Sequence, residues 1–303
     1  MRITYLAHAH IDKQKWDRCI DHSSNGLIYA YSFYLDAMSK HWDALVLNDY
    51  EIVMPLTWNK KYTIYYLYPP FFCAQLGVFG NDITAGIVNA FLKNIPAKFK
   101  YLDFYLNKAN FFSLHGFPMY ERKNYILPLS NNYETIQKNY SESHRRNLTR
   151  AVKAGNTFKK DIPVDNIIKL AVEQSKKFSP VTQKDYNNFS KLFSLLQSKQ
   201  MAASYGVFNR HHQLTASCVF AFSHHRAYYI LVGNHPDGRT SGASHLLIDQ
   251  FIKEHAGKNL ILDFEGGNIS GIGFFYKSFG AVPESYPWIK MNKLPRVAKL
   301  FRK

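Results

Sequence analysis

One segment of the sequence combines residue types that bind anions, and it lies between an apolar run and a helical pattern. It spans residues 234–245 and contains glycines, small hydroxyl residues and one arginine, Arg239. The first turn of a helix offers unpaired N–H groups and the positive end of the helix dipole. Glycine and serine let an anion approach that backbone, and arginine adds a charge-assisted hydrogen bond. The segment therefore predicts a pyrophosphate or phosphodiester site, although an ordinary capped loop with a surface arginine has the same pattern.

Positive charge is the strongest signal in the composition. The 38 Lys and Arg outnumber the 22 Asp and Glu, which gives a net charge of +16. Such a balance favours a nucleic acid, an anionic membrane surface or a phosphorylated substrate as partner. Arg145, Arg146 and Arg150 lie on one predicted helix, where 146 and 150 share a face. They predict binding of a phosphorylated or nucleotide-linked acceptor; an exposed basic helix is the alternative.

The basic residues continue in the tail from Lys290 to Lys303, which contains no acidic residue. This tail predicts peripheral contact with a membrane, or a solvated basic surface. Three scattered cysteines, odd in number, argue against a disulfide framework and predict a cytoplasmic location. No leader-like apolar segment and no membrane-spanning run is recognisable. The paired histidines lack accompanying ligands at metal-binding spacing, so no metal site is predicted.

Two stretches, 91–104 and 251–264, repeat one pattern at an offset of 160 residues. Six positions are identical in each copy: Phe91/Phe251, Lys93/Lys253, Lys98/Lys258, Leu102/Leu262, Asp103/Asp263 and Phe104/Phe264. Each copy reads as a helix that runs into a strand. Self-similarity at a fixed offset indicates a duplicated unit. We therefore predict two domains, 1–132 and 133–303.

The predicted elements of the second half indicate an α+β fold with a layered sheet. Helices at 133–155, 163–178 and 184–199 precede strands at 203–209, 215–223 and 226–232. A helix at 244–255, a strand at 259–264, a helix at 271–278 and a last strand at 286–291 follow.

In this order the motifs resemble the GNAT acyltransferase superfamily. Its pyrophosphate loop, Arg/Gln-x-x-Gly-x-Gly/Ala, is similar to Arg239-Thr240-Ser241-Gly242-Ala243-Ser244, except that serine replaces the last Gly or Ala. Its later signature, Phe-Tyr-x-x-x-Gly-Phe/Ala, is similar to residues 275–281. The resemblance implies tandem GNAT-like units, each a mixed, mostly antiparallel sheet flanked by helices.

A closer resemblance is to the Fem-type branch, the peptidoglycan aminoacyltransferases and related bacterial GNAT-like proteins, which carry two such units. The motifs that carry it are the duplication, the helix 143–150, the run Asp263-Phe264-Glu265-Gly266-Gly267 and residues 276–281. Peptidoglycan enzymes of this branch often insert a long helical arm thought to help with tRNA. The span 161–200 is too short and too apolar for such an arm, which favours acyl-CoA over aminoacyl-tRNA as donor.

The resemblance also suggests residue roles. Tyr276 stands where the superfamily often places a tyrosine that protonates the leaving thiolate; a buried aromatic residue is the alternative. Glu265 follows a strand end and faces two glycines, where a carboxylate could take the proton of an amine; a capping carboxylate is the alternative. At the offset of 160, Arg239 falls on Phe79 and Gly242 on Asp82. Because an acid at a helix start repels phosphate, the first unit is predicted to be degenerate and to bind the acceptor.

These patterns predict an N-acyltransferase that uses acyl-CoA as co-substrate, has no permanently bound cofactor and acylates an amine. An amine linked to a nucleotide or to peptidoglycan is the candidate acceptor. One alternative is an aminoacyl-tRNA-dependent Fem-type enzyme acting on a cell-wall precursor. Another is an inactive protein that binds polyanions such as tRNA.

Overall fold

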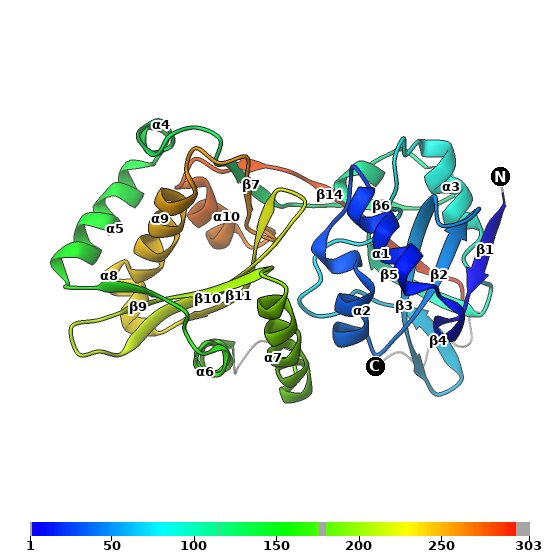
Figure 1. The fold of residues 1–303 in the computed structure, drawn as a ribbon, viewed down its shortest axis with the longest axis horizontal. Coiled ribbons are helices and arrows are strands. Elements are labelled where there is room, and N and C mark those ends of the chain that lie inside the picture. The colour runs from blue at the N-terminus through cyan, green and yellow to red at the C-terminus, as the bar shows by residue number, and fades with distance from the viewer. Residues whose placement is uncertain (1, 115, 176–179, 295–303) are drawn as a thin grey trace. The chain divides into compact units, whose positions relative to one another are not determined.

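The computed structural model describes residues 2–114, 116–175 and 180–294, and the chain divides into two compact units. The first unit contains the residues up to Arg122 together with the C-terminal segment from Ser285. The second is the continuous stretch Lys123–Glu284. The predicted α+β class is confirmed, since each unit has a seven-stranded mixed sheet with helices on it (Figure 1).

The first unit is built on a sheet of order β1-β2-β3-β4-β5-β14-β6. Its strands are β1 (Ile3–Leu6), β2 (His41–Leu47), β3 (Ile52–Lys61), β4 (Ile64–Leu67), β5 (Phe99–Tyr105), β6 (Met119–Arg122) and β14 (Tyr286–Asn292). Its helices are α1 (Lys13–His22), α2 (Ser32–Met38) and α3 (Ala85–Lys93), with short 3-10 turns η1 (His8–His10), η2 (Ile28–Ala30) and η3 (Lys108–Asn110).

The second unit is built on a sheet of order β13-β7-β12-β11-β10-β9-β8. Its strands are β7 (Tyr125–Pro128), β8 (Thr157–Lys160), β9 (Ala202–Phe208), β10 (Leu214–Ser223), β11 (Arg226–Asn234), β12 (Ile261–Asp263) and β13 (Val282–Pro283). Its helices are α4 (Tyr133–Lys138), α5 (Glu142–Lys153), α6 (Val164–Ser175), α7 (Gln183–Ser198), α8 (Pro236–Ser241), α9 (Ala243–His255) and α10 (Ser270–Lys277).

Alternation along β10 buries both faces of the second sheet. Ala216, Cys218 and Phe220 belong to the core shared with α9, where Phe220 stacks on Phe251 at a centroid distance of 3.8 Å. The opposite face carries α6 and α7, so the sheet is a middle layer (Figure 1). Gly233 allows this packing, because a β-carbon there would lie 2.8 Å from the backbone nitrogen of Ala171 in α6.

The first sheet is layered in the same way. The apolar stripe of α3, formed by Val88, Phe91 and Leu92, is buried with inward residues of β2 and β3 in one core. Helices α1 and α2 contact the same two strands and bury Trp16 completely. In both units the helix that crosses over, α3 or α9, joins two parallel neighbours: β4 with β5, and β11 with β12.

The observed division differs from the predicted boundary at residues 132/133, because β7 belongs to the second sheet and β14 to the first. Strand β14 pairs with β5 and β6, which places the C-terminal strand in the first sheet. Strand β7 pairs with β12 and β13 in the second sheet. Backbone hydrogen bonds between distant strands decide where each unit ends, so the end of the predicted duplicate is not a unit boundary.

Local predictions failed at two positions of the second unit. The predicted helix at 133–155 is two helices, α4 and α5, because Ser141 caps a new helix by accepting from the His144 N–H. The predicted loop at 234–245 contains α8, which begins at Pro236 and is followed by Gly242 in a left-handed conformation. The strands β1, β6, β8 and β13 were not predicted.

Candidate active site

Glu265 lies two residues beyond β12 with a buried, unpaired carboxyl group. Its backbone is left-handed, with φ of 62°, and its N–H donates to Asp263 Oδ1 at 3.0 Å. A left-handed conformation costs a non-glycine residue about 1 kcal/mol or more and is often found at functional sites. Oε1 is buried, and the side chain makes no hydrogen bond or ion pair with the described residues. Burial raises the pKa of Glu265 well above its usual value, as a general base requires.

Tyr276, on the inner side of α10, is 9% exposed and stacks on Phe264 at a centroid distance of 4.4 Å. Burial is the largest cause that raises the pKa of its hydroxyl, and the charges of Glu265 and Asp263 raise it further. Glu265 is therefore close enough to act on Tyr276 electrostatically. The Tyr276 hydroxyl has no hydrogen-bond partner within the part of the chain described. The hydroxyl is therefore a protonated phenol at neutral pH, and its role as a proton donor remains a prediction.

The loop between β12 and α10 packs on the ring of Tyr125. Gly267, at φ of +146°, would bring a β-carbon within 2.4 Å of that ring. Gly273 of α10 would place a β-carbon 3.3 Å from the same ring. The predicted run Glu265-Gly266-Gly267 is thus a close turn, and its second glycine lets the loop lie flat against β7.

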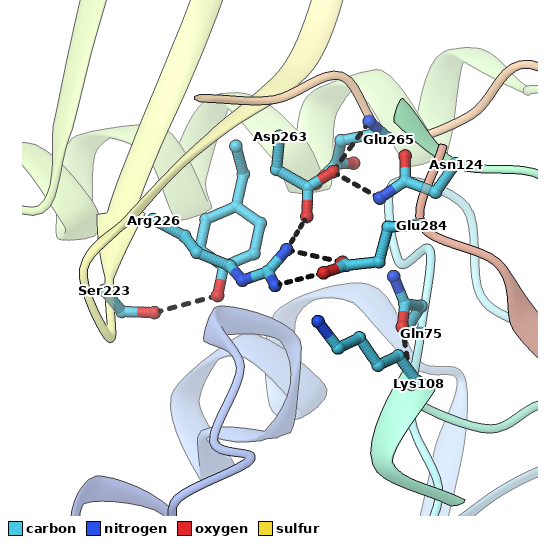
Figure 2. A network of polar contacts seen from close by, with 9 residues as sticks. Gln75, Lys108, Asn124, Ser223, Arg226, Asp263, Glu265 and Glu284 are labelled. Atoms are coloured by element: carbon cyan, nitrogen blue, oxygen red, sulfur yellow. Dashed lines mark hydrogen bonds and ion pairs between the residues drawn. The ribbon is translucent and has the colours of Figure 1, made fainter. Parts of the chain in front are cut away.

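A buried polar network holds the end of β12 (Figure 2). Asp263 pairs with Arg226 at 2.7 Å and accepts from Asn124 Nδ2 at 2.8 Å. Arg226 also donates both amino groups to Glu284 at 2.9 Å. Burial raises the pKa of Asp263, and Arg226 and Asn124 oppose this rise. Asp263 also accepts the Glu265 N–H, so the network positions the loop that carries the unpaired carboxyl group.

The predicted anion-binding segment lies on α8 and the start of α9. Arg239 is exposed, and its guanidinium makes no hydrogen bond or ion pair with the described residues. Thr240, Ser241 and Ser244 donate within the segment, to Asp237 O, Gly238 O and Asn234 Oδ1. Gly242, at φ of 77°, joins the two helices, and a β-carbon there would lie 2.4 Å from the carbonyl oxygen of Asn147. Ala243 is buried at the first position of α9. Phosphate binding at this segment remains a prediction.

The three arginines of α5 are not a single cluster. Arg145 donates to the carbonyl oxygens of Gln137 and Lys138 at the end of α4. Arg146 pairs with Glu142 one turn away at 3.4 Å. Arg150 reaches the carbonyl oxygen of Thr240 at 3.4 Å, at the end of α8. The structure thus brings Arg150, and not Arg145, to the predicted donor segment; acceptor binding by the three remains a prediction.

Sequence reasoning missed a histidine pair where α5 crosses α9. The Nδ1 atoms of His144 and His245 lie 2.6 Å apart, so one ring donates to the other. His144 is fully buried against Tyr140 and Phe279. Burial lowers the pKa of His144 to about 3 and that of His245 to about 4, so both rings are neutral at pH 7. The sequence contained one sign that His144 is buried. It lies seven residues before Ala151, which places both residues on one face of α5, and this is the buried face.

In residues 2–114, 116–175 and 180–294, no group of three or more His, Cys, Asp or Glu is arranged to hold a metal ion. None of the helices described is both long and apolar enough to cross a membrane. The basic tail predicted to touch a membrane spans residues 290–303. Its residues from 295 onward lie outside the described part of the chain.

Solved structures with the same architecture are found by comparison of folds. FemX aligns with a TM-score of 0.68 at 13% identity, covering 100% of both chains. A conserved protein of unknown function from Bacteroides thetaiotaomicron aligns with a TM-score of 0.63 at 10% identity, covering 96% of this chain and 100% of that one. L-PGS from Bacillus licheniformis aligns with a TM-score of 0.53 at 12% identity, covering 86% and 87%.

The chain has the GNAT-like fold of the Fem type. No protein-family model and no curated protein matches the sequence. Within the Fem-type fold, Glu265 and Tyr276 lie after the strand that follows the crossover helix of the second unit. The Arg239–Ser244 segment lies before that helix. The predicted acid, base and donor residues therefore all belong to one unit.

Proposed function

We propose that the protein is an acyltransferase that moves an acyl or aminoacyl group from a phosphate-bearing carrier to an amine. One observation carries the proposal: the Oε1 atom of Glu265 is buried without a hydrogen-bond partner among the described residues, and the charge of Glu265 contributes to the raised pKa of the Tyr276 hydroxyl. A base and an acid are the two groups that acyl transfer to an amine requires. The Fem-type fold supports this reading but does not by itself determine the chemistry.

In the proposed reaction Glu265 accepts one proton and Tyr276 donates one, and both residues return to their starting protonation states. Glu265 takes a proton from the amine, whose nitrogen attacks the carbonyl carbon of the acyl group. When the tetrahedral intermediate collapses, the bond between that carbon and the sulfur of the carrier breaks. The thiolate takes the proton of Tyr276, and the resulting phenolate recovers a proton from Glu265. The net result is an amide and a thiol.

Acyl-CoA is the favoured donor. Arg239 is an exposed cation without a described partner, three residues before the left-handed Gly242 that caps α9. The N–H groups of the first turn of α9 and the Arg239 guanidinium are complementary to a pyrophosphate. In the described residues of the span that would hold a long arm, the helices are α6 with 12 residues and α7 with 16.

Two observations favour other readings. The exposed arginines of α5 favour a tRNA-bound donor, and the fold likeness to FemX agrees with that choice. An inactive polyanion-binding protein would also need such a basic surface. The three readings differ in what they bind and what they transfer.

Titration of CoA into the protein and into Arg239→Ala tests the donor site. We expect the variant to bind CoA about 10-fold more weakly, because a charge-assisted hydrogen bond is lost. Arg210→Ala, which removes an exposed arginine from the β9–β10 turn, is the matched control and should bind as the parent does. Equal affinity in Arg239→Ala and Arg210→Ala would remove the donor site from this segment.

Transfer assays with acyl-CoA and with aminoacyl-tRNA, both read by mass spectrometry of an amine acceptor library, separate the enzymatic readings. Transfer from aminoacyl-tRNA alone would establish the second reading. Steeply salt-dependent tRNA binding without transfer from either donor would establish the polyanion-binding reading.

A further inference from the structure

Three neighbouring strands of the first sheet carry a row of aromatic side chains on one face. Trp288 of β14 lies in register opposite Tyr105 of β5 on one side and Tyr120 of β6 on the other. Residues paired across neighbouring strands point to the same face of a sheet. The other face belongs to the core, where Ile289, the next residue of β14, is fully buried. On the aromatic face Tyr120 is 50% exposed, so a ligand can reach the row.

One arginine lies over this row without a counter-ion. Arg122 follows Tyr120 by two residues in β6, which places both side chains on the same face. Its guanidinium carbon lies 4.8 Å from the centroid of the Tyr105 ring and 5.6 Å from that of the Trp288 ring. Arg122 is half-buried, and its side chain makes no hydrogen bond or ion pair with the described residues. Charged groups withdrawn from water are usually paired, so this position lacks its anion.

The two terminal amino groups of Arg122 are the atoms that a ligand can reach. Nε is buried and unpaired, whereas the two Nη atoms reach solvent and make no hydrogen bond with the described residues. Aromatic rings contact the flat face of a guanidinium, and its N–H groups lie in the plane and point away from the rings. Two parallel N–H groups match two oxygens of a carboxylate or of a phosphate.

The charges around the aromatic row also favour an anion. Lys290, two residues after Trp288, has its Nζ atom 5.0 Å from the centroid of the Trp288 ring. Asp103 stands opposite Lys290 in register, but its oxygens accept from Trp288 Nε1 at 2.7 Å and from the Tyr101 hydroxyl at 3.1 Å. Within the described residues no ion pair joins Asp103 to either cation. Two cations against one carboxylate leave this face positive.

We propose that the β5–β14–β6 face of the first unit binds a small aromatic oxyanion, in which a carboxylate or phosphate group is attached to a flat ring. The Nη groups of Arg122 donate to two oxygens of the anion, and Lys290 adds electrostatic attraction. The ring of the ligand packs on the exposed Tyr120. A cation is repelled by both basic side chains, and a neutral ligand leaves the charge of Arg122 unpaired. The inference concerns the first unit alone and does not rest on the acyltransferase activity.

Ligand-observed NMR titration of the full-length protein tests the ligand class, with benzoate, phenyl phosphate, benzyl alcohol and acetate as probes. We expect saturable binding of benzoate and phenyl phosphate, and the tighter of the two identifies the anionic group. Benzyl alcohol has no charge for the guanidinium and should bind at least about 10-fold more weakly. Acetate lacks the ring and should bind about 3-fold more weakly than benzoate. Benzyl alcohol or acetate binding as tightly as benzoate, or no saturable binding of either aromatic anion up to ~20 mM, overturns the proposal.

Two variants and a matched control locate the site. Arg122→Lys keeps the charge but cannot form the bidentate pair, and we expect about 5-fold weaker binding of the preferred anion. Lys290→Gln removes the second cation and should weaken binding about 2-fold, with a smaller dependence on salt. Arg18→Lys changes an exposed arginine of α1 in the same unit and should bind as the parent does.

The comparison of the two Arg→Lys variants also separates this site from the Arg239–Ser244 segment, which is unchanged in both. Equal anion affinity in Arg122→Lys, Arg18→Lys and the parent, with matching circular dichroism spectra, overturns the assignment, because the binding would then come from another part of the protein.

Discussion

The ends of β5 and β12 hold the same residue in different surroundings. Asp103 and Asp263 occur at the offset of 160 residues, and each follows a crossover helix. Asp103 is half-buried and accepts from Trp288 Nε1 at 2.7 Å. Asp263 is buried and pairs with Arg226. The two aspartates therefore lie on matching strands of the two sheets but have different partners.

The two units also differ at the position two residues after these aspartates. The first unit has Tyr105, whose ring packs edge-on against Trp288. The second unit has Glu265, whose carboxyl group has no partner among the described residues. A ring in an aromatic cluster contributes to packing. A buried carboxyl group without a hydrogen-bond partner lowers stability and is typical of functional sites. Acid–base chemistry is thus expected only from the second unit.

The sharpest test of this comparison is Glu265→Gln. We expect the turnover number to fall by about 10² to 10⁴, because the amide cannot accept the proton of the amine. Tyr105→Phe changes the equivalent position of the first unit and should keep the parental turnover. Steady-state rates of acyl transfer with a matched amine measure both variants.

The pH dependence adds a second readout for Glu265. Because burial raises its pKa, the carboxyl group becomes protonated as pH falls through that raised value. Turnover should therefore decline on the acid side at a higher pH than for an exposed glutamate, and Glu265→Gln should lack this limb. A parental profile that stays flat down to the ordinary range of a glutamate would contradict the base role.

Arg226→Met tests the buried ionic network at the end of β12. We expect a loss of about 3–5 kcal/mol in the free energy of unfolding, because two buried carboxylates lose their shared counter-charge. Arg122→Met in the first unit removes a guanidinium that lies 4.8 Å from the Tyr105 ring centroid, and should cost about 0.5–2 kcal/mol. Urea unfolding measures both losses, and equal losses would mean that the two strand ends are held alike.

Tyr276→Phe is expected to lower turnover by about 10², the lower end of general acid catalysis, because water can replace a phenol as proton donor. The donor affinity should be unchanged, since the ring still stacks on Phe264. Donors with more acidic thiols should lose less rate. If slow and fast leaving groups are equally affected, the hydroxyl has no role in protonating the thiolate.

Gly242→Ala and Asp82→Gly compare two left-handed residues, of which only Gly242 is an N-cap: the structure starts α3 at Ala85 with Thr84 as its N-cap, so the prediction that Asp82 lies at the helix start is wrong. Both residues are left-handed, with φ of 77° and 52°. Alanine at 242 should cost about 1–3 kcal/mol, because of that conformation and of the nearby Asn147 carbonyl. Glycine at 82 should change stability by less than about 1 kcal/mol, since it relieves strain but loosens the unfolded chain. Thermal unfolding measures both, and an unchanged melting temperature for Gly242→Ala would contradict this close packing.

The sequence predicted elements better than their assembly. The helix–strand pairs α3–β5 and α9–β12 followed from apolar periodicity, a local property. The placement of β7 and β14 in their sheets did not, because strand partners more than 130 residues apart leave no local pattern. The short helix α8 had recognisable signals, Pro236 at its first position and Gly242 after its last, but the glycine-rich composition favoured a loop.

The candidate site was predicted in part. Glu265 and Tyr276 were singled out through the resemblance, and the charge of Glu265 contributes to the raised pKa of the Tyr276 hydroxyl; their roles as base and acid remain predictions. Arg226 was not recognised, because a single arginine at the start of an apolar strand reads as a surface residue. His144 was hidden in a basic helix, where a polar ring at a core position looks like part of the charged face.

The strand β14 has a consequence for how the chain folds during synthesis. It lies inside the first sheet, between β5 and β6, and not at its edge. Until residue 292 has left the ribosome, β5 and β6 face a vacant place and expose unpaired backbone groups. The second unit, continuous from Lys123 to Glu284, can close first. The N-terminal half is therefore expected to be the last to become native, and a nascent chain stalled before β14 to be protease-sensitive there.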